Sequence, residues 1–209
     1  MGLNTPAGGK MAYYPKDPKA GGTWFALSDR GNAIVLLNGA SEKHQWQPPY
    51  RKSRGLIVLD LIREDSIADA WQKIDLMGIE PFTLVVYEAQ NLYQYRWDGH
   101  QKERTVLNAN QNYIWSSSPL YPQHIREIRA EWFERFLALK PDRTPAELFN
   151  FHRNTEPSDK QNGLVINRDG LLQTLSITQA MIGPDKVHLT HYDLLAAKTF
   201  SDNFSITAP

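Results

Sequence analysis

The fold is decided by the stretch AGGTWFALSDRGNAIVLLN, residues 20–38. It predicts two strands, at 23–28 and 33–37, joined by a short turn. Gly31 and Asn32 stand in that turn, and both tolerate the positive φ that a tight hairpin requires. Apolar residues fill the two strands almost continuously, which is typical of a sheet covered on both faces. We therefore expect this hairpin in the middle of a layered α/β core.

The sequence on either side predicts an α+β protein with antiparallel hairpins, because strands and helices come in separate groups. We expect one domain over residues 1–209, with a pair of sheets between outer helices and with flexible ends at 1–10 and 198–209. The other predicted elements are, in order, a strand at 11–14, helices at 53–64 and 66–77, strands at 82–88, 92–97, 105–107 and 113–115, helices at 122–139 and 145–152, and strands at 163–167, 173–179 and 187–192.

Composition excludes several classes of protein and of site. Lys and Arg together number 23, and so do Asp and Glu, so no net charge draws the chain to nucleic acid or to an anionic membrane. The chain has no cysteine, which excludes disulfides, thiolate metal sites and a cysteine nucleophile within it. No apolar run approaches the roughly 20 residues that span a bilayer, and residues 1–10 lack the pattern of a signal peptide. We expect a cytoplasmic protein.

Neither the histidines nor the serines form a recognisable catalytic or metal-binding motif. His188 and His191 are the closest histidine pair, but residues three apart in a strand point to opposite faces, so hydrogen-bonded histidines are favoured over metal ligands. No metal and no cofactor are expected. The run Ser116-Ser117-Ser118 lacks the Gly-x-Ser-x-Gly elbow of a serine hydrolase. We expect these serines to cap the helix that follows them.

A basic cluster precedes the first predicted helix and is one candidate for a ligand site. Tyr50, Arg51 and Arg54 lie around the expected N-cap Ser53, where a phosphate or carboxylate could be held. A solvated charged loop is the favoured interpretation of this cluster. Trp24 is expected in the core, and we also include it among the candidate ligand-binding residues.

Three segments carry a resemblance to a known family. PKDPKAGGTW at 15–24, LLNG at 36–39 and PYRKSRGL at 49–56 resemble the NRDE family, also called the transport-and-Golgi-organisation protein 2 family. Gly-Gly-Thr-Trp and Ser-Arg-Gly are the most specific of these marks. Asn-Gly at 162–163, Thr-Leu-Ser-Ile-Thr at 174–178 and Tyr-Asp at 192–193 are consistent with the carboxyl-terminal part of the family.

The resemblance implies a fold and a site. The family is similar to N-terminal-nucleophile hydrolases of the choloylglycine hydrolase branch, whose fold is a four-layer αββα sandwich. In that branch an N-terminal cysteine attacks an amide, and its own α-amine, which titrates near pH 8, serves as the base. By resemblance, the Asn38 amide helps to stabilise the oxyanion. Ser117 stands where the family has the asparagine of a Thr-Asn-Ser-Pro corner, whereas Ser118 and Pro119 match it.

The chain departs from the family at its front. Family members begin Met-Cys and carry an Asn-Arg-Asp-Glu signature soon after, and neither feature is present here. Asn-Arg-Asp at 167–169 is followed by Gly170 and is read as a turn. We therefore expect a sandwich that lacks the family's first strands, and a chain without the usual nucleophile.

Three functions remain open at this point. The first is an amidase-like scaffold for linear carbon–nitrogen bonds, truncated or inactive because the nucleophile is missing. The second, implied by animal members of the family, is binding or trafficking of haem or of acyl-coenzyme A-like ligands. It predicts a pocket bordered by Asn38 and by the cluster at 50–54. The third is an interaction domain without a small-molecule site.

Overall fold

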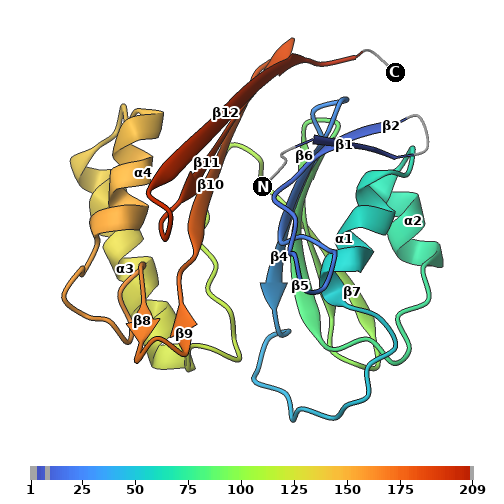
Figure 1. The fold of residues 1–209 in the computed structure, drawn as a ribbon, viewed down its shortest axis with the longest axis horizontal. Helices are drawn as coiled ribbons and strands as arrows, with labels where there is room; N and C mark the ends of the chain where they lie inside the picture. The colour runs from blue at the N-terminus through green and yellow to red at the C-terminus, as the bar shows by residue number, and fades with distance from the viewer. Residues whose placement is uncertain (1–3, 8–9, 208–209) are drawn as a thin grey trace.

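The computed structural model describes residues 4–7 and 10–207 and has the expected α+β composition (Figure 1). Within this part of the chain the helices are α1 (Arg54–Ile62), α2 (Ile67–Lys73), α3 (Gln123–Leu139) and α4 (Pro145–Asn154). An antiparallel seven-stranded sheet contains, in spatial order, β1 (Asn4–Ala7), β2 (Lys10–Tyr13), β3 (Phe25–Ser28), β4 (Ala33–Asn38), β5 (Phe82–Glu88), β6 (Asn91–Trp97) and β7 (Lys102–Leu107). A three-stranded sheet contains β10 (Ser176–Ile182), β11 (Lys186–Asp193) and β12 (Lys198–Ser205), and a small ribbon pairs β8 (Asn167–Arg168) with β9 (Leu172–Gln173).

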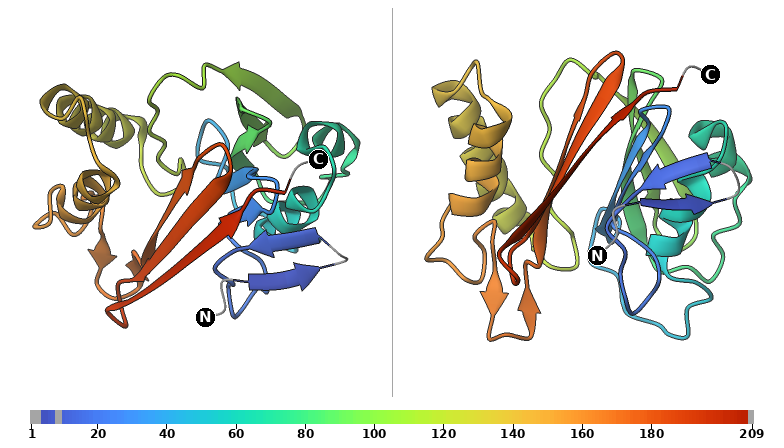
Figure 2. Two further views of the ribbon diagram at one scale, coloured as in Figure 1. Left: turned by 90° about the horizontal axis from the view of Figure 1, so that it is seen from above. Right: turned by 45° about the horizontal axis from the view of Figure 1, so that its top comes forward.

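The two larger sheets lie between two pairs of helices. Figure 1 shows α1 and α2 against one face of the seven-stranded sheet, and α3 and α4 beyond the three-stranded sheet. Figure 2 shows the same succession from a second direction. On the far side, the ring of Phe149 in α4 stacks on Tyr192 of β11 at 3.9 Å between centroids. No helix of the described residues is long and apolar enough to cross a membrane.

The predicted central hairpin is confirmed as β3 and β4. Phe25 pairs with Val35, and Gly31 adopts a φ of +76° in the turn. Every residue of β3 is buried, because α1 covers one face and the three-stranded sheet covers the other. Strand β4 is different: Ile34 is buried toward α1, but Val35 on the opposite face is 36% exposed. The expectation that both strands are covered on both faces is therefore wrong for β4.

Val35 of β4 is exposed because the two sheets contact each other at β2 and β3. Leu27 and Phe25 of β3 pack with Val187 and Leu189 of β11, and Tyr13 of β2 joins them. This second core cluster lies over β2 and β3, so the inner face of β4 is left only partly covered. The larger cluster lies on the other face of the seven-stranded sheet, under α1 and α2.

Helix α2 is held at both ends by charged side chains of the seven-stranded sheet. At its N-terminus, the Glu88 carboxylate of β5 accepts hydrogen bonds from the backbone N–H groups of Ile67 (2.6 Å) and Ala68 (3.1 Å). At its C-terminus, Lys102 Nζ of β7 donates to the carbonyls of residues 71, 72 and 74 at 2.7–2.8 Å. A carboxylate at the first turn and an ammonium at the last both match the helix dipole.

Both ends of the chain are more regular than predicted. Asn4–Ala7 pairs with β2, and Lys198–Ser205 pairs along its whole length with β11. The alternation of half-buried and exposed residues in β12 is hard to recognise in its polar sequence, because Asp202 is half-buried like Phe200 and Phe204. Phe204 stacks on Tyr13 at 3.8 Å, which joins β12 to the larger sheet. Residues 1–3, 8–9 and 208–209 lie outside the described part of the chain.

Two predicted strands are also wrong. Residues 113–115 form no strand, because Trp115 attaches to the sheet by its side chain: Nε1 donates to Gln94 Oε1 at 2.9 Å. In the region 163–167 only Asn167 is in a strand, and it begins the short β8–β9 hairpin whose turn contains Asp169 and Gly170, as the turn prediction for 167–170 required.

Helix α1 reaches the sheet through a contact between two glycines. Thr23 N–H donates to the Gly55 carbonyl at 3.1 Å, and a Cβ on Gly22 would lie 2.4 Å from the Gly55 carbonyl carbon. The Gly-Gly-Thr-Trp and Ser-Arg-Gly segments are therefore in direct backbone contact. This is a physical reason for glycine at both positions.

Replacing Gly22 by Ala is expected to lower the free energy of unfolding by about 2 kcal/mol, because backbone must move to admit the methyl group. Urea denaturation followed by circular dichroism measures this loss. Gly183→Ala is the matched control, because its Cβ would be in ordinary contact at 3.4 Å. A Gly22→Ala protein as stable as that control would contradict the importance of the contact.

Candidate functional site

The structure brings together the two site residues that the resemblance singled out. Ser117 Oγ donates a hydrogen bond to the backbone carbonyl of Asn38 at 2.9 Å, across 79 residues of sequence. Asn38 is the last residue of β4 and is exposed, whereas Ser117 is half-buried. The end of β4 and the 116–119 corner therefore form one local unit.

The three serines hold this corner in place and do not cap α3. Ser118 Oγ donates to the Glu42 carbonyl at 3.2 Å, and Ser116 Oγ accepts from Arg129 Nη1 at 3.3 Å. Helix α3 begins after Pro122, which provides no side-chain cap. The helix-capping prediction is therefore wrong: because the corner lies against the loop after β4, its hydroxyls bond to that loop and to Arg129.

Gly39 determines how closely the two segments approach. Its φ is +82°, and a Cβ there would lie 2.3 Å from Pro119 Cδ and 2.4 Å from Ser118 Oγ. Two further bonds fix its peptide groups: Gly39 N–H donates to the Pro81 carbonyl at 3.0 Å, and Thr83 Oγ1 donates to the Gly39 carbonyl at 3.0 Å. Only glycine satisfies both the backbone angle and the lack of space.

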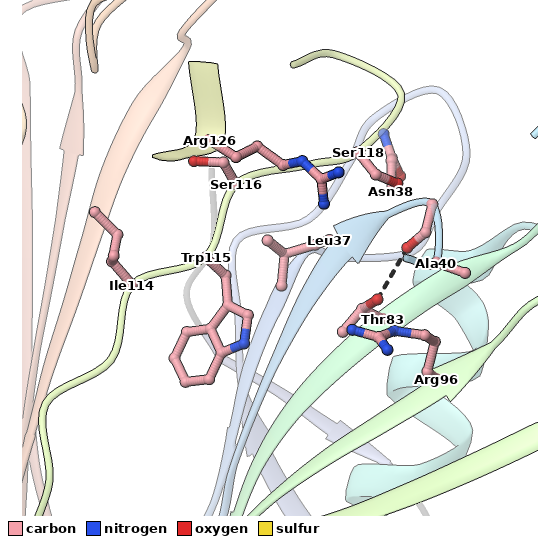
Figure 3. A pocket seen from close by; sticks show the side chains of 11 residues that line it. Leu37, Asn38, Ala40, Thr83, Arg96, Ile114, Trp115, Ser116, Ser118 and Arg126 are labelled. Atoms are coloured by element: carbon pink, nitrogen blue, oxygen red, sulfur yellow. Dashed lines mark hydrogen bonds between the residues drawn. The ribbon is translucent and has the colours of Figure 1, made fainter. Parts of the chain in front are cut away.

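A cavity of about 170 Å³ lies beside this unit (Figure 3). It opens on the inner face of the seven-stranded sheet, which the three-stranded sheet leaves partly uncovered. The lining residues come from the end of β4 and its following loop, from β5 and β6, from the 114–118 segment and from the start of α3. They are Leu37, Asn38, Gly39, Ala40, Thr83, Arg96, Ile114, Trp115, Ser116, Ser118 and Arg126.

The predicted ligand-binding cluster is split by the structure. Trp24 and Arg54 line a second cavity, of about 240 Å³, together with Asn38. Tyr50 and Arg51 are not among its lining residues: the Tyr50 hydroxyl accepts from the Gln47 N–H at 2.9 Å. Arg51 donates instead to the carbonyls of residues 75 and 77, at 2.7 and 3.0 Å. The structure therefore does not unite the four residues into one site, because Arg51 fastens the loop after α2.

Arg54 has a structural role at the mouth of that second cavity. It makes an ion pair with Glu80 at 3.0 Å and donates to the Pro81 carbonyl at 3.2 Å. Burial lowers the pKa of Arg54, and the nearby Glu80 carboxylate opposes that shift. His44 Nε2 lies 3.1 Å from the other Glu80 oxygen, so Glu80 joins the loop after β4 to α1.

Sequence reasoning missed most of the residues that line the 170 Å³ cavity, among them Thr83, Arg96 and Arg126. Thr83 and Arg96 are register partners in β5 and β6, on the face away from α1 and α2, and strand alternation could have placed them there. Arg126 lies in the first turn of α3, where its spacing from the buried Arg129 gives no sign that it reaches the sheet. Its position depends on how the 116–122 segment folds back.

The Gly39 contact generates a prediction with a close control. Gly39→Ala and Gly170→Ala both force alanine into left-handed φ, which costs about 1 kcal/mol at each position, but only Gly39 also lacks space. We expect Gly39→Ala to cost about 1–3 kcal/mol more than Gly170→Ala in urea unfolding, as overpacking typically does. Equal losses would show that the β4 end does not depend on close contact with the corner.

Comparison with known proteins identifies the family of this chain. The chain matches the family described as "Transport and Golgi organisation 2" over residues 8–187, which include both glycine contacts and the whole cavity. No curated protein matches the chain. Because the family match extends over most of the sequence, the chain belongs to the transport and Golgi organisation 2 family.

Proposed function

We propose that this chain binds a small amide-bearing molecule in the cavity beside Asn38 and does not cleave it. The observation that carries the proposal is that Asn38 lines a small polar cavity, where the 2.9 Å hydrogen bond from Ser117 Oγ fixes its backbone carbonyl. The resemblance assigns oxyanion stabilisation in amide hydrolysis to the Asn38 position, and it places Ser117 at the oxyanion site or the rim of its pocket. A site that holds a carbonyl oxygen can still bind an amide when no nucleophile is present.

The scaffold in this proposal is of the N-terminal-nucleophile hydrolase type. Helices outside a pair of facing sheets support it, as does the apolar cluster that Leu27 and Leu189 form between those sheets. The missing component is the thiol, since the 209 residues include no cysteine. Loss of the nucleophile removes most of the rate enhancement of such a catalytic unit, whereas binding groups remain.

The size of the cavities distinguishes between possible ligands. Pockets for drug-sized ligands usually measure about 300–1,000 Å³. The two cavities that Asn38 borders measure about 170 and 240 Å³, which favours a compact ligand over an enclosed haem or acyl-coenzyme A. Binding or trafficking of those larger ligands is therefore the weaker alternative. The cytoplasmic location remains a prediction.

Binding without turnover can be measured in one experiment. N-acetylglycinamide is mixed with the protein, and saturation-transfer NMR reports its binding. The methyl signals of free acetate and of N-acetylglycine report hydrolysis of its two amide bonds. We expect transfer to the acetyl methyl group and neither product above a protein-free sample. Asn38→Ala is expected to weaken binding about three- to tenfold, as for loss of one hydrogen bond of about 1 kcal/mol, because Asn38 lines the cavity.

Ser158→Ala is the control variant, because Ser158 is exposed and lies outside the cavity. It should bind like the unmodified protein. Release of acetate or of N-acetylglycine by the purified chain would overturn the non-catalytic part of the proposal, and the absence of saturation transfer would overturn the binding part.

A further inference from the structure

Two arginines enter the same cavity from different elements. Arg96 belongs to β6 and Arg126 to α3, and both line the 170 Å³ space beside Asn38. Figure 3 shows the Arg96 guanidinium next to Thr83, and the Arg126 guanidinium entering from the side of the 116–118 segment. Their side chains are only about a quarter exposed, at 23% and 25%.

The hydrogen bonds of these arginines are incomplete. Arg96 Nη1 reaches Glu103 Oε2 at 3.2 Å, and Arg126 Nη1 donates to the Ser41 carbonyl at 3.0 Å. The Nε atoms of both are buried and have no hydrogen-bond partner in the described chain. A buried guanidinium donor without an acceptor is costly, and such groups usually have a partner.

The charge of the cavity is not balanced from within. Among the described residues that line it there are two arginines and no carboxylate. The acidic neighbours are largely in solvent: Glu103 is 58% exposed, and Glu42 is 79% exposed and lies 3.8 Å from Arg126. Solvent-exposed ion pairs of this kind contribute little, so the interior of the cavity keeps an excess of positive charge and of N–H donors.

We infer that Arg96 and Arg126 form a subsite for an oxyanion, either a carboxylate or a phosphate, carried by the ligand of this cavity. The guanidinium group offers planar, paired donors that match such oxygens, and hydrogen bonds between two charged groups are the strong ones. This inference rests on the proposed function and adds a substrate class to it. The ligand is an amide with an anionic group a few bonds away, small enough for about 170 Å³.

The experiment compares matched ligands that differ in charge. Kd values are measured by NMR titration for N-acetylglycine, for N-acetylethanolamine phosphate and for neutral N-acetylglycinamide. We expect one or both anions to bind at least about tenfold more tightly than the neutral amide, which is the effect of about 1.4 kcal/mol. The tighter of the two identifies the carboxylate or the phosphate, and the preference should decrease as salt concentration rises.

Substitutions then assign the preference to the two side chains. Arg96→Gln and Arg126→Gln are each expected to reduce the preference for the anion to about twofold or less. Arg96→Lys, which keeps the charge and loses the paired donors, should restore only part of it. Arg135→Gln is the matched control, because Arg135 is exposed, lies on α3 and does not line this cavity. Circular dichroism and thermal unfolding verify that each variant is folded.

The outcomes separate this inference from the proposed function. Equal Kd values for the neutral amide and both anions, all weakened by Asn38→Ala, would overturn the oxyanion subsite and leave amide binding intact. An anion preference that survives both Arg→Gln substitutions would also overturn it. Anion binding that the two Arg→Gln substitutions abolish but that Asn38→Ala leaves unchanged would support the subsite and contradict the amide ligand. No binding of any of the three probes would overturn both.

Discussion

The end of strand β4 and the 116–119 corner can meet only because residue 39 has no side chain. A Cβ at Gly39 would overlap Pro119, and the +82° φ of Gly39 would itself disfavour another residue. Once this contact is made, Ser117 reaches Asn38, Ser118 reaches the loop after β4, and the cavity acquires its polar edge. The site is thus a product of close backbone packing as much as of its polar side chains.

A second glycine contact does the same for the other face of the sheet. Gly22 and Gly55 let the first turn of α1 approach the segment that leads into β3, which gives α1 its place over Ile34 and the large apolar cluster. This docking brings Arg54 to Glu80, so one of the residues first considered for ligand binding also stabilises the loop before β5. The ion pair of Arg54 and Glu80 stabilises this part of the fold. Arg96 and Arg126, in contrast, each have a buried Nε without a hydrogen-bond partner in the described chain.

Local pattern was sufficient for the elements whose burial alternates clearly. The β3–β4 hairpin, the β5–β6 hairpin and helices α3 and α4 could be predicted from the sequence, because their apolar residues follow strand or helix periods. Strand β12 could not, since Asp202 occupies a half-buried position and conceals the period. Asn38 and Ser117 were predicted by resemblance, but Arg96 and Arg126 meet only through tertiary folding, which no local pattern contains.

The hydrogen bonds from Lys102 to the end of α2 affect how copies of this chain interact with one another. Strand β7 ends the larger sheet, and its residues include Lys102, Glu103 and Arg104. Lys102 is already committed to the carbonyls at the end of α2, and Arg104 lies over the Tyr93 ring at 4.6 Å. A second chain could pair with β7 only by removing water from those charges. This edge of the sheet therefore disfavours strand addition and aggregation.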